Sequence, residues 1–280
     1  MELFEPQEPE TPALTTARDL AEVLTPPPID RDGLVLRDEV WGTETEEFLD
    51  RLLVGPGQRV LALGCGLGFD LPRLARRVGP QGEVCALEPD PRLAFESQLL
   101  VDSLRLRNVR VLSGVVMAAL PPGPFDVIFS SWFLAQIDNV PSLLRQLRQR
   151  ISGAGRLGVL DLYPGGLRLF PEAPALEKVL VAASQVGQNF WLMGQLPAAL
   201  VSSGFLLEGA WPRQKAEVPG TPTYRWVERF LLDVGPRLVS QELLEEIEWQ
   251  TLLEEWSNRR VDPSTLLFSP QLVGIIGRGF

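Results

Sequence analysis

The run Gly64-Cys65-Gly66-Leu67-Gly68 directly follows an apolar segment and directly precedes a helical pattern. Glycine lacks the Cβ that would keep a ligand away from the backbone, so this turn can admit a ligand close to the chain. The amide groups that open the next helix carry positive partial charge and attract a carboxylate or phosphate. Such a turn is a weak signal when it stands alone.

A single carboxylate, Glu88, stands at the end of the next apolar run, 20 residues after Gly68. From that place a carboxylate can accept hydrogen bonds from both hydroxyls of a ribose. The turn and the acid together predict a ligand that contains a nucleoside. A second interpretation needs no ligand, because Glu88 would then only cap the helix opened by Pro89-Asp90-Pro91.

The glycine spacing also discriminates between nucleosides. A dinucleotide-binding turn has the pattern G-x-G-x-x-G. In this chain the third glycine, Gly68, comes one residue early and is followed by Phe69. This spacing argues against a nicotinamide or flavin oxidoreductase, which we keep as the least favoured hypothesis for the function.

The composition excludes several kinds of chemistry. Histidine is absent and the cysteines are Cys65 and Cys85, so a disulfide framework, a Cys/His zinc site and a catalytic imidazole are excluded and we expect no metal. The net charge is -10, but the first 50 residues hold 14 of the 36 acidic and 3 of the 26 basic residues, which leaves 22 acidic and 23 basic residues for the other 230. Without a basic stripe, nucleic acid is a poor candidate partner and a neutral or lipophilic small molecule is a better one.

The elements that must position these residues alternate in type. Strand-like apolar runs at 60–63, 83–87, 109–112, 125–130 and 155–162 are separated by helix-like segments at 71–78, 91–104 and 141–151. Continuously apolar strands are typical of a parallel sheet that helices cover on both faces. The pattern predicts an α/β fold with a Rossmann-like, doubly wound sheet.

The sequence pattern divides the whole chain into four regions. Residues 1–43, rich in proline and acids, form an N-terminal arm or lid with one short helix near residues 16–24, and a further helix begins near Glu44. The cofactor-binding core covers 44–164. Residues 165–260 form a helical cap with an edge strand, whose helices are expected at 172–187, 193–203, 223–234 and 240–258. Strand-like segments at 205–211 and 266–280 predict that the chain returns to the sheet edge at its end, with 261–280 as the C-terminal strand.

Apolar runs are too short to span a bilayer and the acidic N-terminus lacks the basic start of a signal peptide. We therefore expect a cytoplasmic protein without a membrane span. Whether it forms a homodimer is open.

Four segments resemble the class I S-adenosylmethionine-dependent methyltransferases, in particular the bacterial small-molecule group similar to the ubiquinone and menaquinone biosynthesis enzymes. FLDRLLVGPGQRVLALGCGLG is similar to the opening helix, strand and glycine turn of that family, and EVCALEPDP to its second strand with the ribose acid. PPGPFDVIFSSWFLAQIDN is similar to the fourth strand and ISGAGRLGVLDLYP to the fifth. The resemblance implies a seven-stranded sheet whose last strand is antiparallel, and S-adenosyl-L-methionine as the cofactor.

The resemblance also implies a role for each matching position. The segment Leu63, Gly64, Cys65, Gly66 to Gly68 would line the methionine end, Glu88 would hold the ribose and Pro89 would lie against the adenine. Gly114, Val115 and Val116 would edge the adenine ring, and backbone carbonyls of Ser130 and Ser131 would accept from the amino group. Three positions depart from the family: Ala62 stands where an acid usually anchors the ammonium group, Val115 where an Asp often takes the adenine amino group, and Gln136 where a His is common.

Methyl transfer from a sulfonium needs mainly placement and exclusion of water, so the absence of histidine is compatible with it. The candidates for a weak base or acceptor-positioning group are Asp161, Tyr163 and Gln136, and Asp161 would equally serve to cap the next turn. The acceptor pocket is expected above the carboxyl ends of the strands. Aromatic and apolar residues predict an aromatic or lipophilic acceptor: Trp41, Trp132, Tyr163, Phe170, Phe190, Trp191, Met193 and Trp226. The alternative is a non-methylating protein of this fold, a cyclase-type catalyst or interaction module, that still binds the cofactor.

Overall fold

The computed structural model of the protein describes residues 30–185, 189 and 191–279. The short helix predicted near residues 16–24 and most of the predicted arm lie outside the described residues. The regional boundaries predicted from the sequence remain a prediction.

Seven strands form one mixed sheet in the order β3-β2-β1-β4-β5-β10-β7. The strands are β1 (Arg59–Leu63), β2 (Glu83–Glu88), β3 (Val109–Ser113), β4 (Phe125–Ser131), β5 (Ile151–Tyr163), β7 (Leu206–Arg213) and β10 (Gln271–Arg278). β1 to β5 pair in parallel, and β10 is antiparallel to both of its neighbours. The prediction of a Rossmann-like, doubly wound seven-stranded α/β sheet with an antiparallel last strand is confirmed.

The last strand lies inside the sheet rather than at its edge, so that part of the prediction was wrong. β10 is inserted between β5 and β7, and β7 forms the edge. The burial of the two strands gives the reason: most residues of β10 are buried, whereas β7 is exposed or half-buried along its whole length. An apolar run such as QLVGIIG is typical of an interior strand.

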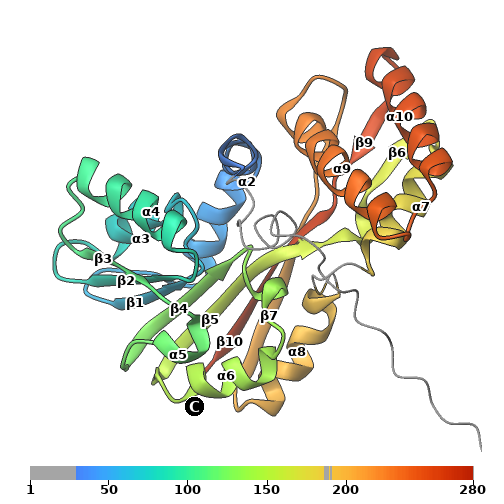
Figure 1. Ribbon diagram of the computed structural model, residues 1–280. Coiled ribbons are helices and arrows are strands. Elements are labelled where there is room, and N and C mark those ends of the chain that lie inside the picture. The colour runs from blue at the N-terminus through green and yellow to red at the C-terminus, as the bar shows by residue number, and fades with distance from the viewer. Residues whose placement is uncertain (1–29, 186–188, 190, 280) are drawn as a thin grey trace, which may run out of the picture. The chain divides into compact units, whose positions relative to one another are not determined.

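Helices cover both faces of this sheet (Figure 1). The first face carries α2 (Arg31–Arg51), α3 (Asp70–Val78) and α4 (Pro91–Ser103), whose apolar side chains share one core with β1 and β2. The second face carries α5 (Val116–Ala119), α6 (Val140–Arg148) and α8 (Leu192–Ser202), which share a second core. None of the described helices is both long and apolar enough to cross a membrane.

A third core draws on the segment that the sequence assigns to the cap and on the start of the segment assigned to the C-terminal strand. It joins a three-stranded antiparallel sheet, ordered β6-β9-β8, to three helices. The bounds are β6 (Arg168–Phe170), β8 (Ala216–Glu217), β9 (Leu266–Phe268), α7 (Pro174–Ala183), α9 (Pro222–Ser240) and α10 (Glu246–Val261). The segment 266–280, read as one strand, therefore supplies two different sheets, because Pro270 separates β9 from β10 and cannot donate to a ladder. The helix expected over 240–258 begins only at Glu246.

The helix predicted to begin near Glu44 begins at Arg31. Its first half lacks a regular apolar period, which is why the sequence pattern missed it. Tertiary contacts stabilise it instead, since Trp41 is buried and Asp38 forms an ion pair with Arg73 of α3. Its second half lies directly on the sheet: a Cβ at Gly274 of β10 would stand 2.4 Å from the ring of Phe48.

We predict that Gly274→Ala destabilises the protein by about 1–3 kcal/mol, because the added methyl overpacks the contact with the buried Phe48 ring. The measurement is the free energy of unfolding in urea. The matched control is Gly153→Ala on β5, where an added Cβ meets nothing within 4 Å and should change stability by less than about 0.5 kcal/mol. Equal effects of the two substitutions would show that α2 does not pack on the sheet this closely.

Candidate functional site

The glycine turn connects β1 to α3 with three left-handed residues. Gly64, Gly66 and Gly68 have φ values of +66°, +57° and +83°, which are strained for any residue with a side chain. A Cβ at Gly64 would collide with the ring of Phe133, whereas one at Gly66 would meet nothing within 4 Å. The turn is therefore packed from beneath by Phe133 and open at Gly66.

Glu88 points at this turn from the end of β2. Its side chain is buried, its Oε2 accepts a hydrogen bond of 2.8 Å from the N–H of Gly66, and its Oε1 accepts one of 3.0 Å from the N–H of Asp90. Burial raises the pKa of Glu88 and the two N–H groups partly oppose that shift. Glu88 does not cap α4, because the N-cap is Asp90, whose carboxylate accepts from the N–H of Arg92.

Ser97, which the sequence pattern did not single out, supports the turn from α4. It is fully buried, and its hydroxyl donates to the carbonyl of Gly66 at 2.6 Å and lies 3.5 Å from Cys65 Sγ. Burial raises the pKa of Cys65 to about 12, so its thiol stays protonated at neutral pH. A small polar residue on the buried face of a helix, seven positions after Asp90, was the available signal for Ser97.

The positions assigned to the adenine differ strongly in exposure. The N–H of Gly114 donates to the carbonyl of Glu88, which brings the end of β3 beside Glu88. Val115 is 67% exposed, Pro89 is half-buried and Val116 is buried in the second core. The structure thus brings these residues to the same edge as Glu88, with Val115 facing solvent.

The remaining predicted positions lie at the ends of β1 and β4. Leu63 and Ala62 are buried and pack in opposite cores. Ser130 is buried beside Leu63, and the hydroxyl of Ser131 donates to Asp70 Oδ2 at 2.7 Å. No polar group stands at Ala62 itself.

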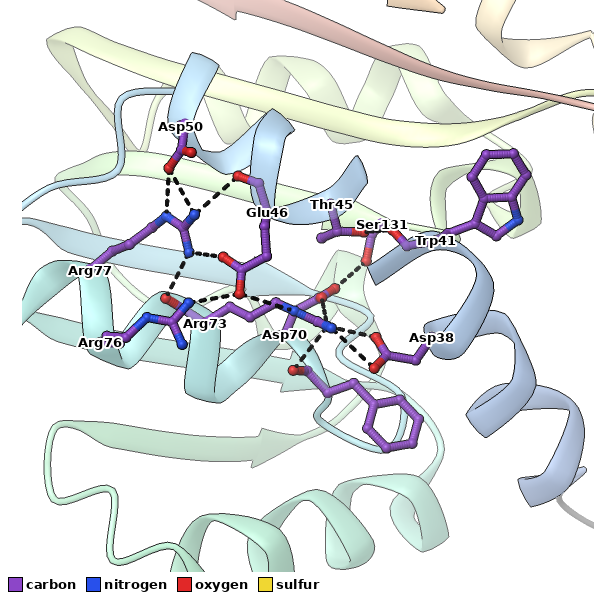
Figure 2. A network of polar contacts seen from close by, with 11 residues as sticks. Asp38, Trp41, Thr45, Glu46, Asp50, Asp70, Arg73, Arg76, Arg77 and Ser131 are labelled. Carbon is purple, nitrogen blue, oxygen red and sulfur yellow. Dashed lines mark hydrogen bonds and ion pairs between the residues drawn. The ribbon is translucent and has the colours of Figure 1, made fainter. Parts of the chain in front are cut away.

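An ion network joins Asp70 to α2, as Figure 2 shows. Arg73 forms ion pairs with Asp70 at 3.0 Å and with Asp38 at 2.6 Å. The hydroxyl of Ser131 donates a hydrogen bond to the other carboxylate oxygen of Asp70. Farther along the two helices, Glu46 of α2 binds Arg76 and Arg77 of α3. The network attaches α2 to α3 beside the glycine turn, and its long sequence separations explain why the sequence did not predict it.

Asp161 is a buried carboxylate at the carboxyl end of β5. Its Oδ1 accepts from the N–H of Leu162 at 2.8 Å, and its Oδ2 has no hydrogen-bond partner among the described residues. Burial raises its pKa to about 6, partly opposed by the hydrogen bond from the N–H of Leu162, by the nearby N–H of Ala135, which makes no hydrogen bond of good geometry, and by the charge of Arg37. Asp161 does not cap the following 3-10 turn, Pro164–Gly166, which has no side-chain cap.

Trp132 directly follows β4 and so lies, like Asp161, at the carboxyl edge of the sheet. It has a left-handed φ of +57°, which is unusual for a bulky residue and is typical of functional sites. The guanidinium of Arg37 lies 4.9 Å from the centre of its ring. Gln136 is exposed and its Nε2 donates to the carbonyl of Trp132 at 3.1 Å.

Of the predicted aromatic residues, three form one cluster at this edge. Trp226 of α9 makes edge-to-face contacts with Trp41 at 5.9 Å and Trp132 at 6.0 Å. Tyr163 forms a separate pair with Trp191 at 5.8 Å.

The other three predicted residues do not join this cluster. Phe170 pairs with Phe268 in the small sheet, and Met193 is buried under the second face. Phe190 lies outside the described residues.

The sequence of this chain is similar to those of known methyltransferases. Residues 36–164 match a family described as a methyltransferase domain. Nocamycin O-methyltransferase of Saccharothrix syringae is 30% identical over 57% of this chain and 63% of its own length. A protein-L-isoaspartate O-methyltransferase of Ignicoccus hospitalis is 36% identical over 52% and 62%, and a demethylmenaquinone methyltransferase of Bacillus cereus 27% identical over 45% and 52%. The chain thus spans between half and two thirds of the length of these relatives.

Solved structures share the fold at low identity. A methyltransferase-like protein of Bacillus halodurans aligns with a TM-score of 0.59 and 16% identity over 83% of this chain and 96% of its own. The [4+2]-cyclase SpnF aligns with a TM-score of 0.55 and 16% identity over 85% and 80%. At this identity the likeness concerns the fold.

We predict that Asp161→Asn alters the pH dependence of stability. The carboxyl of Asp161 has a pKa of about 6 in the folded protein and an ordinary value of 3.8, so the folded state holds this proton more tightly than the unfolded chain does. The wild type should therefore lose on the order of 2–3 kcal/mol of stability, relative to the variant, as the pH rises from about 4 to about 6. Urea unfolding of both proteins between pH 4 and pH 8 measures the difference, and a difference independent of pH would contradict the burial of this group.

Proposed function

We propose, from the premise that residues 36–164 are a class I S-adenosylmethionine-dependent methyltransferase domain, that the protein transfers a methyl group to a small molecule. The observation that carries the proposal is the bridge from Glu88 to the open glycine turn. A buried carboxylate beside an open glycine is the arrangement that a ribose and its neighbouring groups require.

The residues fit the cofactor that the family implies. Each oxygen of Glu88 accepts one N–H, and a carboxylate has about four lone-pair sites, so both oxygens can still accept ribose hydroxyls. The space beside Gly66 is open, since a Cβ built there would meet nothing within 4 Å. Leu63 to Gly68 would hold the methionine end, Pro89 and Gly114 to Val116 the adenine, and Ser130 and Ser131 would offer backbone carbonyls.

When bound, S-adenosylmethionine supplies a methyl group on a sulfonium whose leaving group is already activated. The protein then has to place the acceptor and exclude water, which can lower the barrier by several kcal/mol. The unpartnered Oδ2 of Asp161 can accept a hydrogen bond or a proton from the acceptor, since a pKa of about 6 leaves the group mostly ionised at neutral pH. Tyr163 and Gln136 are the other groups at this edge that can position an acceptor.

The acceptor is proposed to be aromatic or lipophilic. Trp132 follows β4 and its ring contacts that of Trp226 on α9, and both rings offer flat apolar surface. Arg37, above Trp132, is a charged neighbour that can orient a polar head group. The acceptor surface is thus apolar with a polar end.

A second function is favoured by two positions. Ala62 is buried and Val115 exposed, and neither provides the carboxylate that usually binds the cofactor there. A protein that binds the cofactor but acts as a cyclase-type catalyst or interaction module would tolerate the absence of both carboxylates. Binding of S-adenosylmethionine without methyl transfer to any member of a broad acceptor panel would favour this function.

We predict that Glu88→Ala weakens the binding of S-adenosylmethionine and S-adenosylhomocysteine by about 10- to 100-fold, because the loss of hydrogen bonds to a charged group costs about 1.5–3 kcal/mol. Isothermal titration calorimetry measures both affinities, with NAD as a third ligand. NAD should not bind, and tight binding of NAD alone would favour an oxidoreductase.

The control variant is Glu83→Ala, at the opposite end of β2 and half-buried, which should leave these affinities unchanged. Glu88 also accepts two backbone N–H groups, so thermal unfolding of each variant is recorded beside the titration. A folded Glu88→Ala protein with unaltered affinity would refute the proposed ribose site.

We also predict that Val115→Asp strengthens the binding of S-adenosylhomocysteine by about three- to tenfold. The side chain is exposed, so the new carboxylate stays hydrated until it accepts a hydrogen bond from the adenine amino group, worth about 0.5–1.5 kcal/mol. Calorimetry compares it with Val201→Asp, an exposed position on α8 that makes the same charge change. Equal affinities in both variants would mean that the adenine does not lie at Val115.

A further inference from the structure

An apolar cavity of about 60 Å³ lies between the end of β5 and the helices α7 and α9. Leu162 of β5 and Pro164 of the turn that follows it line the cavity, together with Leu180 and Ala183 of α7 and Trp226 and Phe230 of α9. None of the described residues that line it carries a charged side chain. One water needs roughly 10–15 Å³ of such space, so the cavity can hold a chain of about four to six heavy atoms.

The lining determines what such a space can bind. A water inside a cavity needs two to four polar partners, and an apolar cavity offers almost none, so it stays dry and binds apolar groups. Each methylene that leaves water for such a place contributes about 0.8 kcal/mol, which corresponds to about fourfold in affinity. The cavity therefore favours a hydrocarbon chain over a polar or charged group.

The cavity adjoins the proposed acceptor site. Trp226 lines the cavity and also contacts the ring of Trp132, which follows Ser131 at the end of β4. Leu162 lines it from the position directly after Asp161 on β5. An acceptor held at the carboxyl edge of the sheet can therefore extend an apolar tail past Trp226 into the cap.

We propose that the acceptor carries a hydrocarbon tail, and that the cavity between β5, α7 and α9 binds this tail. This inference rests on the proposed function for the identity of the reacting end, but the cavity itself is formed by β5, α7 and α9. The tail binding site selects acceptors by length, because the tail gains affinity only until the cavity is full.

The test uses 4-n-alkylphenols from 4-methylphenol to 4-octylphenol, titrated into the 280-residue protein with and without saturating S-adenosylhomocysteine. Affinity should rise about fourfold per methylene and then reach a plateau. In Ala183→Leu, which adds three carbon atoms inside the cavity, the plateau should come about three carbons earlier. In Leu180→Ala, which removes three, it should come about three carbons later.

The control is Val181→Leu, on the same helix but 64% exposed, which should leave the series unchanged. Variants that move the plateau in opposite directions exclude a general folding defect as the cause. A series without dependence on tail length would show that the cavity is only a packing void. Binding of S-adenosylhomocysteine is measured separately, so a flat series with intact cofactor binding overturns this inference alone, and loss of cofactor binding with an intact series overturns the proposed function alone.

Discussion

The buried carboxylate of Glu88 is the constraint on which the site depends. Taking a carboxylate out of water costs free energy, and the N–H groups of Gly66 and Asp90 offset that cost. These two groups belong to the glycine turn and to the start of α4, so one side chain sets the position of both. Ser97 completes the arrangement by donating to the carbonyl of Gly66. The group that holds the turn is therefore also the proposed ribose acceptor.

The sequence was most informative where a local pattern and a buried environment coincide. The strands β1 to β5 were found because continuous apolar runs are typical of a sheet covered on both faces, and Glu88 was found because it ends such a run. The position of β10 inside the sheet was missed because the pattern gives a strand but not its neighbours. The first half of α2, Ser97 and the ion network of Arg73 were missed because their partners are distant in sequence. The cavity under Trp226 depends on the packing of three elements and has no signal in any of them.

The way α2 is attached has a consequence for the site. Its ion pairs with α3 are at least partly exposed on one side, and such pairs typically contribute about 0–1 kcal/mol each. The contacts of Phe48 with Gly274 and of the buried Trp41 with Trp226 remove apolar surface from water and dominate the energetics. α2 is thus part of the core, and it brings Arg37 and Asp38 to the carboxyl edge of the sheet. The sequence analysis assigned these residues to an N-terminal arm or lid.

Two kinds of interaction, hydrogen bonding and the burial of apolar surface, are available at the carboxyl edge of the sheet. At the glycine turn, the proposed binding of a ribose depends on directed hydrogen bonds to a carboxylate and backbone groups, which tolerate little displacement. Beyond Trp132 the surface is apolar, and binding there grows with the area removed from water rather than with direction. A reaction that needs an activated methyl group at a fixed point and a variable acceptor opposite it suits this division. Because placement provides most of the rate in such a displacement, the absence of histidine is compatible with the proposed reaction, in which the orphan oxygen of Asp161 is the proposed proton acceptor.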